Sequence, residues 1–235
     1  MSVPVIAIDG PGGSGKGEIS RRVARELGWH LLDSGALYRL VALAALRARV
    51  CADDAERLAA LARGLDARFR LSIDGEAAVR LADRDVSADV RSEACGSMAS
   101  RIAPLPPVRE ALLDVQRKFR QPPGLVADGR DMGSVVFSDA DLKIFLTATL
   151  AERAGRRYKQ LKQKGISVSL PALSAELAER DRRDSERPVA PIEPAPGAEI
   201  LDTTHLSIEE TVTAVLSKAA AAIPDLGRRR GEASH

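Results

Sequence analysis

The sequence "VPVIAIDGPGGSGKGE", residues 3–18, places an apolar run directly before a glycine-rich loop. The run at 3–9 is short and rich in β-branched residues, which is typical of a strand buried on both faces. After the loop, Ile19, Val23 and Leu27 recur every four residues between charged residues. This spacing predicts a helix with one apolar face. Strand, loop and helix therefore follow one another without a spacer.

The loop has the spacing of a nucleotide-binding P-loop, with Gly10, four further residues, Gly15 and then Lys16. Glycines let successive backbone N–H groups surround a phosphate, and the helix N-terminus adds partial positive charge. An ordinary glycine-rich turn would explain neither the lysine nor the flanking strand and helix. The residues expected to bind the donor nucleotide are Gly10, Pro11, Gly12, Gly13, Ser14, Gly15, Lys16, Gly17 and Glu18.

Length and charge are those of a nucleotide enzyme, although they do not identify one. A chain of 235 residues is long enough for one α/β domain with insertions, and a net charge of +2 indicates no nucleic-acid partner. No stretch reaches 18 apolar residues and the start lacks a basic region, so we expect a cytoplasmic protein without a membrane segment. The two cysteines, Cys51 and Cys95, have no metal-like spacing.

Further strands and helices alternate along the chain, which predicts a three-layer α/β fold with a central parallel sheet. Residues 67–81 instead alternate with period two around Asp74-Gly75, which predicts a β-hairpin inserted into that fold. The other expected strands are "WHLLDS" (29–34), "GLVADG" (124–129), "LKIFLTA" (142–148) and "AEILDTT" (198–204). The expected helices are 35–49, 89–103, 107–120 and a long charged stretch before the last strand.

A P-loop alone is compatible with a kinase, a hydrolytic motor or a GTP switch. A GTP switch usually reads guanine through an Asn-Lys-x-Asp motif, and this chain contains no asparagine. A motor needs an acid at the end of an apolar strand, and Asp128 could serve. The stretch "DGRDMG", residues 128–133, continues with charges that suit substrate binding better.

Two further stretches accompany "DGRDMG": "LLDSGALYR" at 31–39 and "ERDRRDSERPVAP" at 179–191. Together with the P-loop and "ISVSL", they closely resemble the bacterial cytidylate kinase family, over about residues 3–222. The resemblance implies a P-loop kinase domain over 1–225 and a flexible basic tail over 226–235. It also implies an acceptor-binding insertion at about 40–105 that includes the hairpin, and a helical lid at about 153–187.

The family resemblance implies an ATP-dependent nucleoside monophosphate kinase that converts ATP and CMP, or dCMP, into ADP and CDP, or dCDP. Mg²⁺ would be held by the ATP phosphates and water, and we expect a monomer that acts on small molecules. Two alternatives stay open, a broader UMP/CMP kinase and a nucleotide-binding protein with impaired catalysis. Phosphoryl transfer mainly requires two aligned phosphates and neutralised charge, which arginines and a metal provide.

The resemblance also assigns arginines to the two phosphates. Arg39 and Arg130 would hold the acceptor phosphate, with a contribution from Arg180. Arg153 and Arg157 lie at i and i+4 on one helix face, so both would lean over ATP, one stacking on adenine and one reaching phosphate. The expected catalytic residues are Lys16, Arg130, Arg157 and Arg180.

Base choice follows from hydrogen-bond patterns. Cytosine offers an amino donor beside two acceptors, so its site needs a carboxylate next to a guanidinium. The resemblance places Asp131 and Arg109 there, with Ser100. Asp184 and Arg187 would hold the ribose or the far edge of the nucleotide. The "DSGALYR" motif adds Ser34, Gly35 and Tyr38 to the acceptor site.

Glu18 departs from the family pattern, in which Gly-Lys-Gly is followed by a threonine whose hydroxyl donates to the α-phosphate. The substitution removes a donor to an anion, worth about 1.5 to 3 kcal/mol. The carboxylate suits the first turn of a helix, and it could also join the Mg²⁺ shell. We adopt the interpretation that Glu18 removes this hydrogen bond and does not act as a metal ligand.

Overall fold

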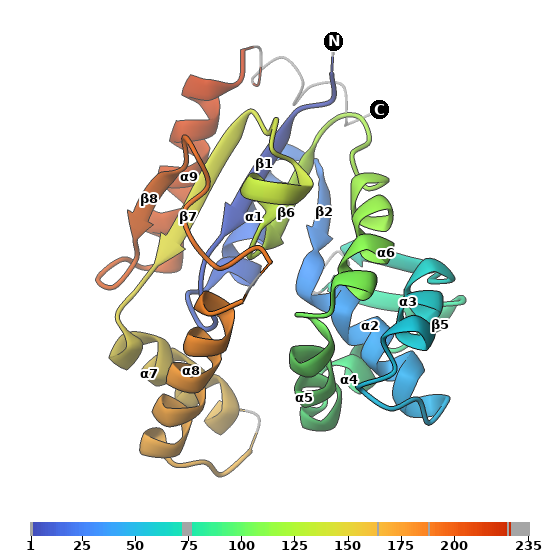
Figure 1. Ribbon diagram of the computed structural model, residues 1–235. Coiled ribbons are helices and arrows are strands. Elements are labelled where there is room, and N and C mark those ends of the chain that lie inside the picture. The colour runs from blue at the N-terminus through green and yellow to red at the C-terminus, as the bar shows by residue number, and fades with distance from the viewer. Residues whose placement is uncertain (1, 72–76, 164, 188, 225, 227–235) are drawn as a thin grey trace.

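The computed structural model describes residues 2–71, 77–163, 165–187, 189–224 and 226. Its centre is a five-stranded sheet in the order β2-β6-β1-β7-β8, in which all neighbouring strands are parallel (Figure 1). The strands are β1 (Val5–Asp9), β2 (His30–Asp33), β6 (Leu125–Gly129), β7 (Leu142–Thr147) and β8 (Glu199–Asp202). All five were expected from their apolar runs.

Helices cover both faces of this sheet. Helices α1 (Lys16–Leu27) and α9 (Ile208–Ala222) pack on one face, where Ile6 and Ile8 of β1 contribute to the core. The opposite face receives Val5 and Ala7 and packs against α2 (Ser34–Arg47) and α6 (Pro106–Arg117). Because alternate residues of β1 enter different cores, the strand is apolar from Val5 to Ile8. The predicted three-layer α/β fold is confirmed.

The chain between β2 and β6 contains further helices and a second, smaller sheet, which are inserted into the main fold. Helices α3 (Ala55–Arg63), α4 (Ser87–Val90) and α5 (Glu93–Ile102) accompany a small antiparallel sheet of β3 (Ala67–Leu71), β4 (Ala77–Leu81) and β5 (Arg84–Asp85). The pairing of β3 with β4 confirms the predicted hairpin, whereas its predicted turn at Asp74-Gly75 lies outside the described residues.

Two local predictions in this insertion were incomplete. The expected helix at 89–103 is divided, because Ser92 is extended and its side chain caps α5 by accepting from the Cys95 N–H at 3.3 Å. Strand β5 was not expected, since its turn uses Ala82 and Asp83 at φ 47° and 60° instead of the glycine or asparagine that usually marks such a turn.

A helix pair, α7 (Leu150–Gln163) and α8 (Leu170–Ser185), extends beyond the carboxyl ends of β1 and β7 (Figure 1). A single π-helical turn, η1 (Met132–Val136), follows β6. These elements and the insertion lie at the carboxyl ends of the strands, where the P-loop begins. At the end of the chain, Leu226 is buried in the core beside α9, and the rest of the expected tail lies outside the described residues.

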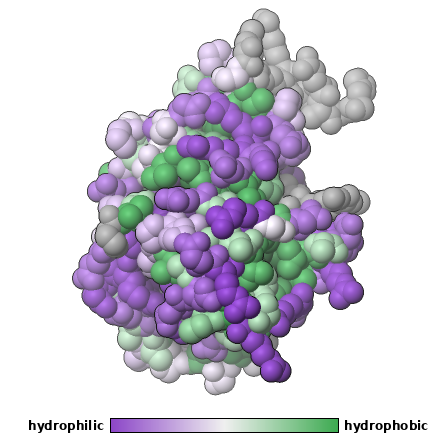
Figure 2. All heavy atoms as spheres, turned by 45° about the vertical axis from the view of Figure 1, so that its right-hand side comes forward, coloured by the Kyte–Doolittle hydropathy of each residue, from purple (hydrophilic) through white to green (hydrophobic). Residues whose placement is uncertain are grey.

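Hydrophilic side chains spread over the face shown in Figure 2, with hydrophobic ones in small groups between them. Within the described ranges, no helix combines the length and the apolar character needed to span a membrane.

Candidate active site

The P-loop leaves β1 so close to β7 that its first residue has to be glycine. Gly10 has a φ of 149°, and a Cβ built on it would lie 2.1 Å from the Leu146 carbonyl oxygen. Gly15, at φ 90°, is the left-handed residue immediately before α1. The loop therefore ends with its backbone turned into the N-terminus of α1, where N–H groups are available to a phosphate.

Lys16 begins α1 and is buried, and its Nζ donates to the Pro11 carbonyl oxygen at 3.0 Å. Burial lowers the pKa of Lys16, and the nearby guanidinium of Arg130 lowers it further, while Asp128 opposes the shift. Burial likewise raises the pKa of Asp128, against the attraction of Lys16. A triphosphate bound by the loop would add negative charge beside Lys16 and so favour its charged form.

Three neighbouring strands carry a carboxylate at their carboxyl ends: Asp33 and Asp9 are the last residues of β2 and β1, and Asp128 is the last but one of β6. Asp33 caps α2 by accepting from the Ala36 N–H at 2.9 Å, and Asp9 accepts two backbone N–H groups after β6. No described residue donates a hydrogen bond to Asp128, which lies beside Lys16. Asp9 was not among the expected site residues, and Asp128 was considered only as a motor acid. The signal for both is an acid that ends an apolar strand.

Of the two α7 arginines expected to lean over the donor nucleotide, only Arg153 contacts the P-loop. Arg153 is buried, donates to the Gly12 carbonyl oxygen at 3.0 Å and pairs with Asp181 of α8 at 2.6 Å. Arg156, which was not expected, donates to the Ser14 carbonyl oxygen at 3.3 Å. The Arg157 side chain is exposed and has no hydrogen bond or ion pair with any described residue. The face that meets the P-loop thus carries residues three apart, Arg153 and Arg156, and leaves Arg157 outside.

Next to the P-loop lies a pocket with about 610 Å³ of empty space, part of it open to solvent. Its walls come from α2, α5, α6, the turn after β6, α8 and the segment after it. The pocket brings together all eleven residues expected at the acceptor site: Ser34, Gly35, Tyr38, Arg39, Ser100, Arg109, Arg130, Asp131, Arg180, Asp184 and Arg187. They come from segments more than 150 positions apart in the chain, since Ser34 and Arg187 both line it.

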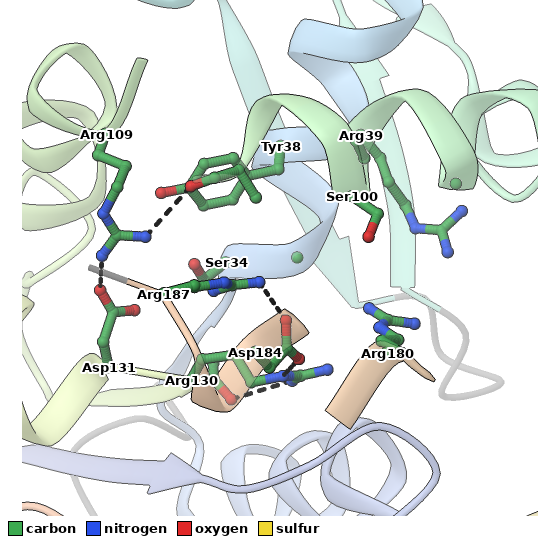
Figure 3. A pocket seen from close by; sticks show the side chains of 15 residues that line it. Ser34, Tyr38, Arg39, Ser100, Arg109, Arg130, Asp131, Arg180, Asp184 and Arg187 are labelled. Atoms are coloured by element: carbon green, nitrogen blue, oxygen red, sulfur yellow. Dashed lines mark hydrogen bonds and ion pairs between the residues drawn. The ribbon is translucent and has the colours of Figure 1, made fainter. Parts of the chain in front are cut away.

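One side of the pocket concentrates positive charge (Figure 3). Arg39 donates to the Val90 carbonyl oxygen at 2.8 Å, and Arg130 pairs with Asp184 at 3.1 Å. Arg180 forms no ion pair with a described residue. Burial lowers the pKa of Arg180 to about 10, and repulsion from Arg130 adds to the shift. A cation with a lowered pKa beside other cations marks a place where an anion is favoured.

The other side of the pocket presents a carboxylate beside a guanidinium. Arg109 donates to Asp131, and both side chains are about nine-tenths buried (Figure 3). Tyr38 lies close by, and burial raises its pKa to about 12, so it is a neutral phenol at physiological pH. This wall of the pocket therefore places hydrogen-bond acceptors next to hydrogen-bond donors.

The comparison with known proteins decides the family. The family model described as cytidylate kinase matches residues 6–221. A cytidylate kinase of Bordetella pertussis is 58% identical over 215 residues, covering 92% of this chain and 94% of the relative. Those of Methylococcus capsulatus and Nitrosococcus oceani are 53% and 54% identical, covering 92% and 91% of this chain and 96% and 95% of theirs. The chain belongs to the cytidylate kinase family. It is accordingly a nucleoside monophosphate kinase.

Two pocket residues of this family member, Ser34 and Ser100, are held by side chains that were not expected at the site. Ser34 donates to the Gln116 side-chain oxygen at 2.9 Å, so its one proton is already used. Ser100 accepts from Arg183 of α8 at 3.1 Å. Asp184 is almost fully buried and accepts from both Arg130 and Arg187. Gln116 lies outside the quoted motifs, whereas Arg183 lies within "ERDRRDSERPVAP" but was not expected at the site.

The side chain of Glu18, which departs from the family pattern, forms ion pairs along the side of α1. One of its oxygens accepts from Arg21 and the other from Arg22 at 2.7 Å. Arg22 also pairs with Glu209 of α9 at 2.7 Å. The negative charge that replaces a threonine is thus compensated by two arginines one turn further along the helix.

Proposed function

We propose that this kinase transfers the γ-phosphate of ATP to CMP and to dCMP, giving ADP and CDP or dCDP. The observation that carries the proposal is the arrangement of the pocket. Its arginine-rich side adjoins the P-loop lysine, and its far side presents the Asp131–Arg109 pair. A nucleoside monophosphate bound with its phosphate at the arginines would direct its base toward that pair.

On the donor side, the P-loop and Lys16 would bind the triphosphate. The lysine would exchange its bond to the Pro11 carbonyl oxygen for the β- and γ-phosphates. Arg153 would act close to the loop, where its contact with Gly12 holds it, and Arg157 would reach the nucleotide from the surface of α7. Because phosphoryl transfer depends on positioning and on neutralising charge, these cations are the groups that it needs.

On the acceptor side, Arg39, Arg130 and Arg180 would hold the monophosphate. Electrostatic coupling of Lys16 to Arg130 and to Arg180 indicates that the two phosphate sites are close. The arginines would offset the repulsion between two anions, so that the acceptor oxygen can approach the γ-phosphate. No acidic or basic group has to change its charge for this step.

Base selection would rest on Asp131 and Arg109. Cytosine would donate its amine to the carboxylate and accept from the guanidinium, whereas uracil would meet acceptor with acceptor and donor with donor. The mismatch would cost on the order of 2 kcal/mol or more. A broader UMP/CMP kinase is the alternative, and the relative rates with CMP and UMP decide between them. Asp184 and Arg187, which bind one another, would hold the ribose or the far edge of the nucleotide.

The residues present fit a magnesium ion that is bound mainly by the donor phosphates. Mg²⁺ is usually held by one or two carboxylates together with phosphates and water. Asp128 is a buried carboxylate at the P-loop without a hydrogen-bond donor among the described residues, and Gly17 offers no hydroxyl. We assign Asp128 to the ion, directly or through water. The ion would neutralise phosphate charge.

The same proposal assigns roles to larger parts of the chain. Residues 40–105 would form the acceptor-binding insertion, and residues 153–187 a lid whose closure excludes water and limits ATP hydrolysis. The kinase would act as a monomer. Its substrates would be small nucleotides of the cytoplasm.

A coupled assay of ADP release with CMP, dCMP, UMP and AMP as acceptors tests the proposal. We expect CMP and dCMP to be used at least tenfold better than UMP or AMP in kcat/KM, which corresponds to about 1.4 kcal/mol. Lys16→Ala should abolish turnover without loss of the fold. Retention of more than a tenth of the activity would exclude Lys16 from the reaction, and equal use of UMP would favour the broader kinase.

A further inference from the structure

Asp9 is a buried carboxylate that the reaction as proposed does not use. It is the last residue of β1, it is 4% exposed, and it does not line the pocket. Its Oδ1 accepts from the Met132 N–H at 2.9 Å, and its Oδ2 accepts from the Gly133 N–H at 2.8 Å. These N–H groups open η1, where a helical turn leaves donors without partners. One side chain thus occupies both donors.

The carboxylate is attached to a rigid part of the molecule. In the register of the sheet, Asp9 lies between Gly129 of β6 and Phe145 of β7. The next residue, Gly10, packs directly against the carbonyl oxygen of Leu146. Asp9 therefore cannot shift without moving the centre of the sheet, and the two N–H groups that it binds are fixed relative to the P-loop.

The residues immediately before Met132 are Arg130 and Asp131, which are assigned to the acceptor's phosphate and base. We propose that Asp9 is a positioning residue that fixes the peptide after Asp131 and thereby directs both side chains into the pocket. Since Asp9 also immediately precedes the P-loop, it ties the acceptor-reading turn to the donor site. This inference rests on the proposed function and adds to it the residue that holds the specificity pair.

A purely stabilising role would not explain the charge. Burial raises the pKa of Asp9 to about 6 despite the two backbone hydrogen bonds, and the Asp131 carboxylate contributes to the rise. A raised pKa means that ionised Asp9 costs the folded state free energy at neutral pH. A carboxylate at this position can, however, accept hydrogen bonds from both N–H groups at once, one with each oxygen.

The test is Asp9→Asn, which keeps the size of the side chain but turns an NH₂ group toward one of the two N–H donors. We expect the KM for CMP to rise about tenfold or more and the KM for ATP to change less than about threefold, with a reduced preference for CMP over UMP. The matched control is Asp141→Asn. Asp141 accepts from the Val5 N–H at 2.8 Å at the other end of β1, away from the pocket, and this variant should keep both KM values.

An equal rise in both KM values, or no rise, would overturn the proposal. A second measurement needs no variant: amide hydrogen exchange by NMR in the wild-type protein. The Met132 and Gly133 amides should be protected without nucleotide and should exchange more slowly still when CMP binds. Lack of protection, or no response to CMP, would also overturn it. If wild type does not phosphorylate CMP, the proposed function fails, whereas protection of these amides would still report the hold of Asp9 on the turn.

Discussion

We propose that acceptor choice depends on Asp131 and Arg109, so the most selective residue-level change is Asp131→Ala. It removes the group that would accept the cytosine amine and leaves Arg109 without its partner. We expect kcat/KM for CMP to fall about tenfold to a hundredfold, and kcat/KM for UMP to fall much less. Asp114→Ala, at an exposed carboxylate of α6, is the control and should change neither. Equal losses with both acceptors would remove Asp131 from base recognition.

Glu18 gives a second prediction at the residue scale. Glu18→Thr restores a hydroxyl donor at the P-loop and removes a carboxylate that Arg21 and Arg22 neutralise. We expect the KM for ATP to fall several-fold, with the KM for CMP and the Mg²⁺ requirement unchanged. Glu209→Gln, which disturbs Arg22 from α9, is the control for the altered ion pairs. Weaker ATP use, or a higher Mg²⁺ requirement, would make Glu18 a working part of the site.

The buried carboxylate of Asp9 predicts a pH dependence of stability. Its folded pKa is about 6 and its ordinary value is 3.8, so between these values the folded state holds more protons than the unfolded state. This contribution to the free energy of unfolding must therefore fall as pH rises from about 4 to 6. Urea unfolding should show a smaller fall over this window for Asp9→Asn than for wild type. Identical slopes would indicate that Asp9 has an ordinary pKa.

At the scale of the elements, α7 presents two kinds of arginine to the donor side. Arg153 is buried against the P-loop, whereas Arg157 is exposed and available to a nucleotide. Arg157→Ala should lower kcat more than it raises the KM for CMP, because its charge is needed most in the transition state. Arg182→Ala is the control, since Arg182 is an exposed arginine of α8 that pairs with Glu179 and Glu186. An unchanged kcat would reassign Arg157 to the surface.

The elements also show where sequence patterns suffice. The central strands β1 and β6 could be predicted because burial on both faces requires apolar runs such as "VIAI". The edge strand β8 was expected to be buried as well, but it is mostly exposed. Strand β5 and the break between α4 and α5 could not, since they depend on a turn at Ala82 and Asp83 and on the capping of α5 by Ser92. Neither residue type is specific enough to indicate a turn or a cap by itself.

At the scale of the whole molecule, the motifs predicted which residues gather in one pocket, but not how they are held. Asp131 and Arg187 belong to motifs that meet in one pocket. The supporting contacts of Asp9, Gln116 and Arg183 join segments that carry no shared motif, and only the fold brings them together. Such contacts depend on tertiary packing, which periodicity and spacing do not encode.

The central claim is that the pocket beside the P-loop receives CMP in line with the γ-phosphate of ATP. The most direct test is ³¹P NMR of a mixture of the protein with ATP, CMP and Mg²⁺. We expect CDP and ADP to appear at equal rates, with little inorganic phosphate, and Lys16→Ala to form neither. Release of inorganic phosphate without CDP, or no change in the nucleotides, would contradict it.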